Sequence, residues 1–404
     1  METKTFSAGK RGDKVRSDCY IELSPAPSGI DIELKSKVSA MYGKTLKTQL
    51  QSLCDYFELK NVKVYLEDFG ALQPTIAARF EQAVKQMFPE TKKEYLPEFH
   101  PENLYGTTKD KLRRSRLYLP GNEPKFYPNA GLHKPDGVIL DLEDSVAPTE
   151  KVSARFLVRN TLRAINFYKA ERMVRINQLP MGLEDLNFIV PHNVNVILIP
   201  KVESADQIKQ VEEKVLELKK KHNLENEVYF MPIIESALGV MKAYEIATAS
   251  KYNCSLAIGL EDYTADLGTQ RTDEGKESIF ARSTLINAAK AAGIQPIDTV
   301  YSDVSNMEGL RESVIEAKSL GFEGKGCIHP RQIKVIHEAI APEEKEIEKA
   351  KKIVLAFDEA TAKGLGVVSL GSKMIDAPVV KRAQNTIKLA ILNNLLSENW
   401  KELN

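Results

Sequence analysis

The chain is poor in cysteine. Its 404 residues include only Cys19, Cys54, Cys254 and Cys327, and no two of these stand in CxxC spacing. Structural zinc sites and the disulfide frameworks of small secreted proteins both need closely spaced cysteines. We therefore expect four reduced thiols in a cytoplasmic protein, without a zinc site or a disulfide framework.

The sequence also lacks an excess of charge of either sign and any long hydrophobic run. Lysine and arginine together number 56, and aspartate and glutamate also number 56. This balance offers no electrostatic footprint for nucleic acid or for an anionic membrane surface. No stretch approaches 18 apolar residues, and residues 1–6 contain no apolar signal core. We expect neither a nucleic-acid partner nor a membrane partner.

A segment rich in proline and charge divides the chain. Residues 89–106 show no sustained hydrophobic period, which is typical of a connector, and we assign a linker to 89–110. Upstream, residues 1–88 predict a small α+β domain whose core is marginal on its own. Its predicted strands are 19–23, 30–34 and 62–66, and its predicted helices are 38–57 and 74–87.

Downstream of the linker, apolar runs alternate with helical stretches. Continuous apolar runs are typical of parallel strands that are covered on both faces. Eight such units predict an α/β fold, a (β/α)8 TIM barrel within residues 111–370. A doubly wound open sheet is the alternative, but no GxGxxG motif opens the first helix. The predicted strands are 117–121, 137–144, 173–177, 194–202, 228–235, 254–262, 299–303 and 324–330.

Helical sequence continues past the eighth strand. Residues 332–364 predict a helix that is interrupted at Ala341-Pro342, and residues 379–396 predict another. We assign residues 371–404 to a C-terminal helical extension. A closed barrel does not need these helices, so they pack on the barrel or on another subunit. The second arrangement would give an oligomer with a shared active site.

Two acids end neighbouring apolar runs. Glu235 ends the run 228–235, and Asp262 ends the run 254–262. The carboxyl ends of barrel strands meet at one face, so these two side chains are expected to converge. Mg²⁺ takes one or two protein carboxylates and completes its shell with other oxygens. We predict a metal site at Glu235 and Asp262; helix caps or salt bridges are the structural alternative. Strand alternation turns Glu261 to the opposite side and favours Asp262.

Two cations are expected at the same face. Arg175 lies in an apolar strand, where an unpaired charge is costly. It is either ion-paired with Glu203 or Asp141, or it offers its guanidinium to a substrate carboxylate or a developing enolate. Lys201 ends the fourth predicted strand. A mouth with acids and these cations suits a metal ion and an anionic substrate.

Three acids follow the second predicted strand. They are Asp141, Glu143 and Asp144, and we expect at least one of them to cap the helix that begins near Pro148. His329 ends the last strand, where it serves either as a hydrogen-bonded core histidine or as a catalytic one.

Across residues 116–370, the motifs resemble the citrate lyase β subunit and its relatives in the HpcH/HpaI aldolase superfamily. Seven motifs occur in the order of that family, which makes the resemblance specific. They are Arg116-Leu-Tyr-Leu-Pro-Gly, Asp136-Gly-Val-Ile-Leu-Asp-Leu-Glu-Asp-Ser-Val-Ala-Pro, Val174-Arg-Ile-Asn, Pro200-Lys-Val-Glu, Ile234-Glu-Ser-Ala, Gly259-Leu-Glu-Asp-Tyr-Thr-Ala-Asp-Leu-Gly and Gly321-Phe-Glu-Gly-Lys-Gly-Cys-Ile-His-Pro.

The resemblance implies a TIM barrel with Mg²⁺ bound by Glu235 and Asp262. It also implies that Arg175 contacts the substrate during catalysis and that other residues at the mouth help bind the acyl thioester. Members of the family are commonly trimers or larger, with a C-terminal segment reaching a neighbouring subunit's site, so we expect a homo-oligomer, a trimer or a hexamer. The residues expected to bind substrate are Arg116, Asp141, Glu143, Asp144 and Lys201.

The N-terminal module resembles the citrate lyase acyl carrier protein, the γ subunit. The match runs through Ala8-Gly9, Arg16-Ser-Asp-Cys-Tyr-Ile-Glu-Leu, Gly29-Ile-Asp-Ile-Glu-Leu, the helix from Val38 and Asp68-Phe-Gly-Ala-Leu72. That family carries a phosphoribosyl-dephospho-CoA arm on a serine just before the first strand. Ser17 is the nearest equivalent, although the local spacing differs by a few residues. Ser7 is a weaker alternative, and an unmodified module is the other reading.

Together these features predict a Mg²⁺-dependent carbon–carbon lyase. It would cleave a 3-hydroxyacyl thioester of the citryl-ACP or citryl-CoA type to oxaloacetate and an acetyl thioester, with a citrate lyase α-type transferase subunit as partner. Three alternatives stay open: a malyl-CoA or citramalyl-CoA lyase acting on free CoA thioesters, a carrier or assembly subunit whose barrel has little activity, and a barrel that handles pyruvate or phosphoenolpyruvate. The sequence identifies no general base, and a neighbouring subunit could supply one.

Overall fold

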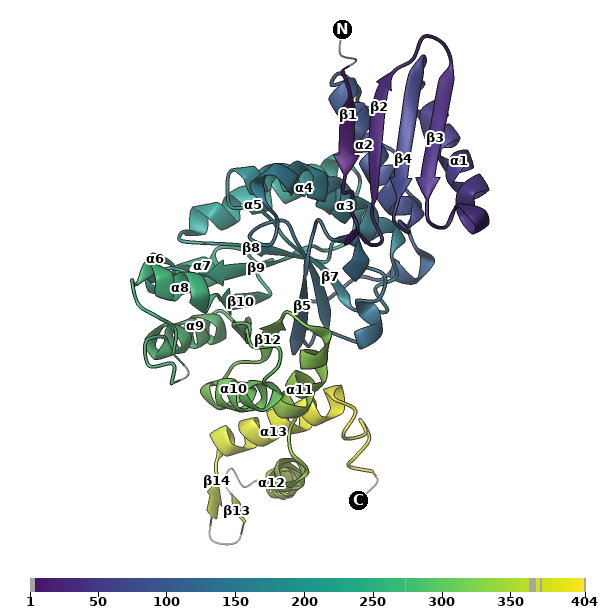
Figure 1. Cartoon of the computed structure of the whole chain (residues 1–404). Helices are drawn as coiled ribbons and strands as arrows, with labels where there is room; N and C mark the ends of the chain where they lie inside the picture. The colour runs from purple at the N-terminus through teal and green to yellow at the C-terminus, as the bar shows by residue number, and fades with distance from the viewer. Residues whose placement is uncertain (1–3, 273, 363–367, 371–372, 403–404) are drawn as a thin grey trace.

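The N-terminal module is a four-stranded sheet covered by two helices. The computed structural model describes residues 4–272, 274–362, 368–370 and 373–402. The strand order is β1-β2-β4-β3, and α1 and α2 pack on one face of the sheet (Figure 1). In β2 and β4 alternate residues are buried, as expected for a half-buried strand. The elements are β1 Phe6–Gly9, β2 Cys19–Pro25, β3 Ile30–Ser36, α1 Ser39–Tyr56, β4 Val62–Asp68 and α2 Gln73–Met87.

Eight parallel strands form a closed barrel, which confirms the predicted fold class. The strand order is β10-β11-β12-β5-β6-β7-β8-β9, and the seam between β12 and β5 closes it. Strands β6 and β8 are buried at every residue, because helices cover the outer face of the barrel and side chains fill its inside. The strands are β5 Ser115–Pro120, β6 Gly137–Asp141, β7 Glu171–Arg175, β8 Val196–Ile199, β9 Tyr229–Ile234, β10 Ser255–Ile258, β11 Gln295–Asp298 and β12 Gly324–Cys327.

The helices of the outer layer follow the strands in turn. At the start of α5, the Gln207 side-chain oxygen accepts a hydrogen bond from the Ser204 backbone N–H at 3.1 Å, which completes a capping box. The helices are α3 Lys151–Ala164, α4 Met181–Ile189, α5 Ala205–Lys221, α6 Ala237–Met241, α7 Ala243–Thr248, α8 Leu260–Asp266, α9 Ile279–Ala291, α10 Met307–Leu320 and α11 Pro330–Ile340. Within the described ranges, no helix combines the length and apolarity that crossing a bilayer would require.

The seventh strand was predicted in the wrong place. We expected it at 299–303, but β11 spans Gln295–Asp298 and the residues after it form a loop. The true strand has only four residues and contains Pro296, which cannot donate to a neighbouring strand and therefore weakens the sequence signal. The apolar pair Val300-Tyr301, just after β11, led to the prediction of a strand at 299–303.

A helical subdomain follows the barrel. Helix α11 ends at Ile340 and α12 begins at Glu344, so the predicted interruption at Ala341-Pro342 is confirmed. Helices α12 (Glu344–Ala362) and α13 (Ala377–Leu392) pack together, with the hairpin β13 (Val368–Leu370) and β14 (Lys373–Ile375) beside them (Figure 1). Of the predicted segments, residues 363–364, 371–372 and 403–404 lie outside the described residues.

The N-terminal module is held against the barrel by a buried ion pair and a buried hydrogen bond between α2 and α3. Arg159 of α3 donates to both oxygens of Glu81 of α2, at 3.0 and 2.6 Å, and both side chains are fully buried. Arg79 of α2 pairs with Asp18 at 2.6 Å and also donates to the Ser153 hydroxyl of α3. These contacts fix α2 along α3 (Figure 1).

The segment that we assigned as a linker lies along the barrel. Arg163 of α3 donates to the Pro97 carbonyl at 2.6 Å, and the Tyr105 hydroxyl donates to the Ala170 carbonyl at 2.6 Å. A short 3₁₀ helix, Pro101–Asn103, lies between these two contacts. The module is therefore fastened through its connector as well as through α2.

We expect Glu81→Gln to lower the free energy of unfolding by about 3 kcal/mol, because it leaves the Arg159 charge buried without its main partner. Glu338→Gln is the matched control: it breaks a pair with Arg311 in which both side chains are exposed, and should cost less than about 1 kcal/mol. Chemical denaturation of the two variants measures the difference. Equal losses would show that the buried pair does not hold the module.

Candidate active site

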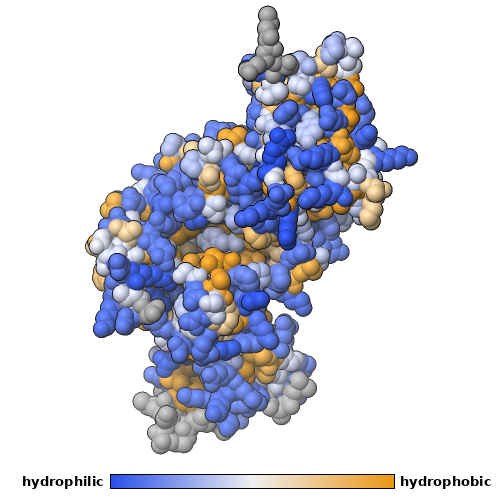
Figure 2. All heavy atoms as spheres, viewed as in Figure 1, coloured by the Kyte–Doolittle hydropathy of each residue, from blue (hydrophilic) through white to orange (hydrophobic). Residues whose placement is uncertain are grey.

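A cavity of about 570 Å³ opens at the carboxyl ends of the barrel strands. In Figure 2 the molecule is hollowed over the barrel strands, and hydrophobic residues edge the hollow. Apolar wall residues include Ile233, Ala257 and Ile258. Of the predicted site residues, six line the cavity: Arg116, Asp141, Asp144, Arg175, Glu235 and Asp262. Glu143 and Lys201 contact these residues without lining the cavity themselves.

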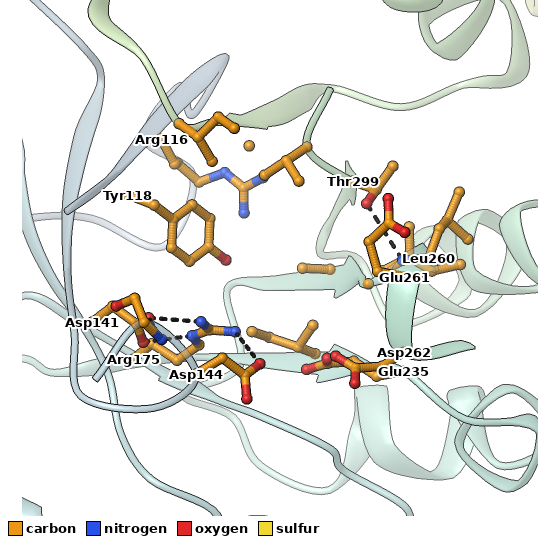
Figure 3. A pocket seen from close by; sticks show the side chains of 18 of the residues that line it. Arg116, Tyr118, Asp141, Asp144, Arg175, Glu235, Leu260, Glu261, Asp262 and Thr299 are labelled. Atoms are coloured by element: carbon orange, nitrogen blue, oxygen red, sulfur yellow. Dashed lines mark hydrogen bonds and ion pairs between the residues drawn. The ribbon is translucent and has the colours of Figure 1, made fainter. Parts of the chain in front are cut away.

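Glu235 and Asp262 are brought together as predicted, but from different kinds of element. Glu235 directly follows β9 and is buried, with 4% of its surface exposed. Asp262 lies in the first turn of α8, not in a strand, and its side chain is 42% exposed. The strand-alternation argument that separated it from Glu261 was therefore wrong, since β10 ends at Ile258 and both acids belong to the helix. Figure 3 shows the carboxyl groups of Glu235 and Asp262 side by side.

Close backbone approach makes room for this pair. A Cβ atom on Gly259 would lie 2.9 Å from the Glu235 side chain, so only glycine lets the start of α8 pass this near. Burial, together with a hydrogen bond to Asp262, raises the pKa of Glu235 well above its usual range. The neutral form of Glu235 is therefore favoured beside Asp262. A divalent cation held between the two carboxylates would offset their repulsion.

The donor set fits Mg²⁺ with open coordination positions. Among the described residues, no group of three or more histidine, cysteine, aspartate or glutamate side chains could hold a metal ion. Two carboxylates are what Mg²⁺ typically takes from a protein, the remaining oxygens coming from water and substrate. Glu235 and Asp262 could hold such an ion in an exchangeable, substrate-accessible site.

Arg175 is fixed by acids of the second strand end. Its Nε and Nη2 atoms donate to the two Asp141 oxygens, each at 2.7 Å, and its Nη1 lies 3.0 Å from Glu143. The structure thus contains the Asp141 pair named among the alternatives, whereas Glu203 instead accepts from the Ser236 hydroxyl at 2.6 Å. Burial opposes ionisation of Asp141, but the Arg175 guanidinium outweighs it and lowers the pKa of Asp141.

Lys201 bridges the two groups of acids. Its Nζ lies 3.1 Å from Glu143, 3.4 Å from Asp144 and 3.6 Å from Asp262. Burial disfavours its charge, but the hydrogen bond to Glu143 and these carboxylates outweigh burial and raise the pKa of Lys201. Lys201 therefore carries a positive charge between the predicted metal pair and the acids that follow β6.

Two expectations about local roles were wrong. None of the acids after β6 caps α3; Asp141 instead accepts from the backbone N–H groups of Glu143 and Ser145, at 3.0 and 3.1 Å, and closes the turn after the strand. His329 is half-buried and caps α11, its Nδ1 accepting from the Arg331 N–H at 3.2 Å. It is neither a core histidine nor a cavity residue.

Arg116 and Tyr118 reach the cavity from β5. Both point to the inside of the barrel, because residues two apart in a strand share a face. Figure 3 shows the Arg116 guanidinium directed into the cavity near Tyr118 and Thr299. Tyr118 and Thr299 were not predicted from the sequence. Alternation from Arg116 was a signal for Tyr118, whereas Thr299 was hidden by the misplaced seventh strand.

The loop with Ser17 rests on the rim of the barrel. Ser17 is half-buried between β1 and β2 and has a positive φ of 54°. In the same loop, Lys10 forms an ion pair with Glu123 at 2.6 Å and lies 3.4 Å from Glu150. Glu123 stands three residues beyond Pro120, which lines the cavity. Lys10 therefore ties this loop to segments that follow β5 and β6 at the carboxyl ends of the strands, and Ser17 itself does not line the cavity.

Both the barrel and the N-terminal module are similar to known proteins. Residues 114–330 match the family model described as HpcH/HpaI aldolase/citrate lyase, and residues 10–87 match that of the malonate decarboxylase delta subunit (MdcD). Citrate lyase subunit beta of Haemophilus influenzae is 44% identical over 69% of this chain and 97% of its own length. The mitochondrial citramalyl-CoA lyase of Homo sapiens is 33% identical over 69% of this chain and 85% of its own.

A solved structure is similar as well. CitE from Mycobacterium tuberculosis, in complex with magnesium, acetoacetate and coenzyme A, has 29% sequence identity and a TM-score of 0.58. The match covers 69% of this chain and 98% of that chain. That protein therefore holds magnesium and coenzyme A on a similar fold.

We expect Glu235→Gln and Asp262→Asn each to weaken Mg²⁺ binding at least about tenfold, because each removes one of two carboxylate ligands. Titration with Mn²⁺, followed by its electron paramagnetic resonance signal, measures the affinity. Glu261→Gln is the matched control, since Glu261 neighbours Asp262 in α8 and lines the same cavity. Unchanged Mn²⁺ affinity in either ligand variant would remove this pair as the metal site.

Proposed function

Because the chain belongs to the HpcH/HpaI aldolase/citrate lyase family, we propose that its barrel cleaves citryl thioester to oxaloacetate and an acetyl thioester. It is an oxo-acid lyase that uses Mg²⁺ and thioesters of the coenzyme A type. The observation that carries the proposal is the buried Glu235 carboxyl beside Asp262, in a cavity that two arginines also line. We include in this proposal the division into a carrier-like module (1–88), a connector (89–110), a barrel (111–370) and an extension (371–404).

The reaction sets requirements that the chain's residues meet in part. The tertiary hydroxyl loses its proton, the carbon–carbon bond breaks towards the thioester, and the resulting enolate carbon is protonated. Glu235 and Asp262 would hold Mg²⁺, which would supply Lewis-acid activation of the substrate hydroxyl and its neighbouring carboxylate. Arg175, immobilised by Asp141, contributes a fixed positive charge for the enolate. Apolar side chains form part of the cavity wall, and displacement of water by bound substrate would strengthen these electrostatic interactions.

The acids after β6 and Lys201 shape the anionic side of the mouth. Asp141 and Glu143 hold Arg175 in position, and Lys201 holds Glu143 and Asp144 near Asp262. We assign Asp141, Glu143, Asp144 and Lys201, together with Arg116, to substrate binding and orientation. Their contacts support this assignment because each is either at the cavity wall or one contact from it.

We further propose that the substrate is carried on the same chain. Residues 10–87 are similar to an acyl carrier subunit, and the Ser17 loop meets the barrel rim through Lys10 and Glu123. A phosphoribosyl-dephospho-CoA arm on Ser17 would start beside the cavity mouth. A carrier docked in cis raises the effective concentration of the acyl group at the site.

Two kinds of partner belong to this proposal. The arm must be charged with its acyl group, which calls for a transferase of the citrate lyase α type. A second copy of the chain is the other partner, in a trimer or hexamer. Support for it comes from a group of exposed apolar side chains on α6, α7 and α9, helices that contact one another: Leu238, Met241, Tyr244 and Phe280. Exposed apolar patches of this kind are typical of subunit interfaces.

A second candidate is cleavage of free CoA thioesters. The similarity to human citramalyl-CoA lyase and to a structure that contains coenzyme A favours it. In that case the N-terminal module would be unmodified and would serve only to stabilise the barrel.

A substrate panel distinguishes the two candidates. With Mg²⁺ present, we expect kcat/KM to be highest for citryl thioester, lower for citramalyl-CoA and malyl-CoA, and abolished for all three by a metal chelator. Coupled detection of oxaloacetate, pyruvate or glyoxylate measures each rate. Faster cleavage of citramalyl-CoA or malyl-CoA would select the second candidate, and cleavage that resists the chelator would exclude metal-assisted chemistry.

Intact-mass analysis tests the attachment site. We expect protein from the native host to carry an added mass that Ser17→Ala abolishes and Ser7→Ala retains, because only Ser17 lies in the loop at the barrel rim. Ser17→Ala should still cleave free citryl-CoA, since Ser17 does not line the cavity. An unmodified wild-type chain, or a modification that persists in Ser17→Ala, would contradict the assignment.

A further inference from the structure

Arg116 is a buried cation that no carboxylate of the described chain neutralises by an ion pair. Only 1% of its surface is exposed. Its Nη1 contacts the Met231 sulfur at 3.0 Å, its Nη2 is 3.4 Å from the Asp298 carbonyl, and its Nε has no hydrogen-bond partner among the described residues. Burial lowers the pKa of Arg116 from its usual value, which reflects an environment that disfavours the charge.

Other buried arginines of this chain are better satisfied. Arg113 binds both oxygens of Glu171 at 2.9 Å, and Arg159 binds Glu81 in the same manner. Arg172 has no carboxylate in such a pair, but it donates to two backbone carbonyls at 2.7 Å. Arg116 has only a thioether and a long contact. Because a guanidinium that leaves water without strong acceptors is costly, this group is poised for an acceptor that the chain does not supply.

The geometry of the barrel explains why the nearest acid cannot serve. Arg116 points inwards. Asp298 also lines the cavity, but its strand neighbour Ile297 belongs to the core inside the barrel, so the Asp298 carboxylate is directed outwards while its backbone carbonyl faces Arg116. On the outer side, the Asp298 carboxylate binds Lys325 at 2.6 Å and Arg282 at 3.3 Å. Arg116 can therefore reach only the backbone carbonyl of Asp298.

Arg175, the other arginine of the cavity, is already engaged. Asp141 occupies its Nε and Nη2, and Glu143 lies against its Nη1. A ligand carboxylate that enters the cavity thus finds one guanidinium bound by acids of the chain and one, Arg116, that has none. An arginine fork binds a carboxylate through two parallel N–H···O bonds, which an ammonium group or a single hydroxyl does not reproduce.

Resting on the proposed function, we propose that Arg116 determines specificity by binding the carboxylate of the acyl group that lies farthest from the metal pair. A citryl group differs from a citramalyl group in one place: it has a carboxymethyl substituent where citramalyl has a methyl. Figure 3 shows Arg116 on one side of the cavity and the Glu235–Asp262 pair on another. A citryl group whose hydroxyl and adjacent carboxylate lie at the Glu235–Asp262 pair would direct this substituent towards Arg116. Arg116 then selects tricarboxylic over dicarboxylic acyl groups.

The experiment compares Arg116→Met with wild type on citryl-CoA and citramalyl-CoA, both as free thioesters and both with Mg²⁺. We expect kcat/KM for citryl-CoA to fall on the order of 100-fold, the scale for removing one member of a buried charge pair. For citramalyl-CoA it should change less than about threefold. Arg172→Met is the matched control, because Arg172 is equally buried but does not line the cavity; it should leave the ratio of the two substrates unchanged.

Equal losses for both substrates in Arg116→Met would overturn the proposal, since they would make Arg116 a structural residue. The affinity of the Mg²⁺-loaded protein for oxaloacetate and for pyruvate provides a second measurement, which requires neither catalytic turnover nor the Arg116→Met variant. Calorimetry should show oxaloacetate binding at least about tenfold more tightly than pyruvate to wild type, and Arg116→Lys should narrow that gap because it keeps the charge and loses the fork. Equal affinities in wild type would also overturn the proposal. Failure of the proposed function is distinct: wild type would then cleave neither thioester, whatever the binding ratio.

Discussion

Closure of the eight-stranded barrel is the constraint on which the rest of the structure depends. Hydrogen bonding between β12 and β5 brings together segments about 200 residues apart and forces all eight carboxyl ends to one face. Acids at the ends of β6 and β9 and in α8 then line one cavity, at a repulsive cost that the chain must offset. Arg175 and Lys201 offset it for the acids after β6. Glu235 has no ion pair with a described cation, and its burial beside Asp262 raises its pKa; a divalent cation bound by both carboxylates would offset their repulsion.

The sequence was sufficient for features that depend on local pattern. Continuous apolar runs located seven of the barrel strands, and acids at the ends of those runs located Glu235 and Asp262. It was insufficient where tertiary contacts decide the outcome. The four-residue β11 is held by its neighbours despite Pro296, and β1 is held by pairing with β2 and packing on α2. Asp262 reached the mouth from a helix because Gly259 ends the strand early, which no alternation rule could show.

The pairing of charged residues also depends on tertiary contacts that the local sequence pattern does not show. Pattern alone could not tell whether Arg175 was paired with Asp141, since the two are 34 residues apart in sequence and meet only through the β6–β7 pairing. The contrast between Arg175 and Arg116 is likewise a product of the fold. One guanidinium stands at a strand end among acids, and the other stands deeper in the barrel, where the pleat turns the nearest carboxylate to the outer side. The Arg175 guanidinium is therefore already bound by carboxylates of the chain, whereas the Arg116 guanidinium can still bind a carboxylate of a ligand.

The main consequence of the buried ion pair between Arg159 and Glu81 is that it fixes the position of α2 relative to α3. Removing two charges from water costs about as much as their attraction returns, so apolar side chains of similar size could have held α2 on α3 with comparable stability. A bidentate pair differs from an apolar contact in allowing one relative position of the two helices. That position puts the Lys10–Ser17 loop on the rim next to Glu123. If the module carries an arm on Ser17, as proposed, the module itself would not swing between sites. The arm would supply the reach to the cavity, and an enzyme that charges it would approach the same rim.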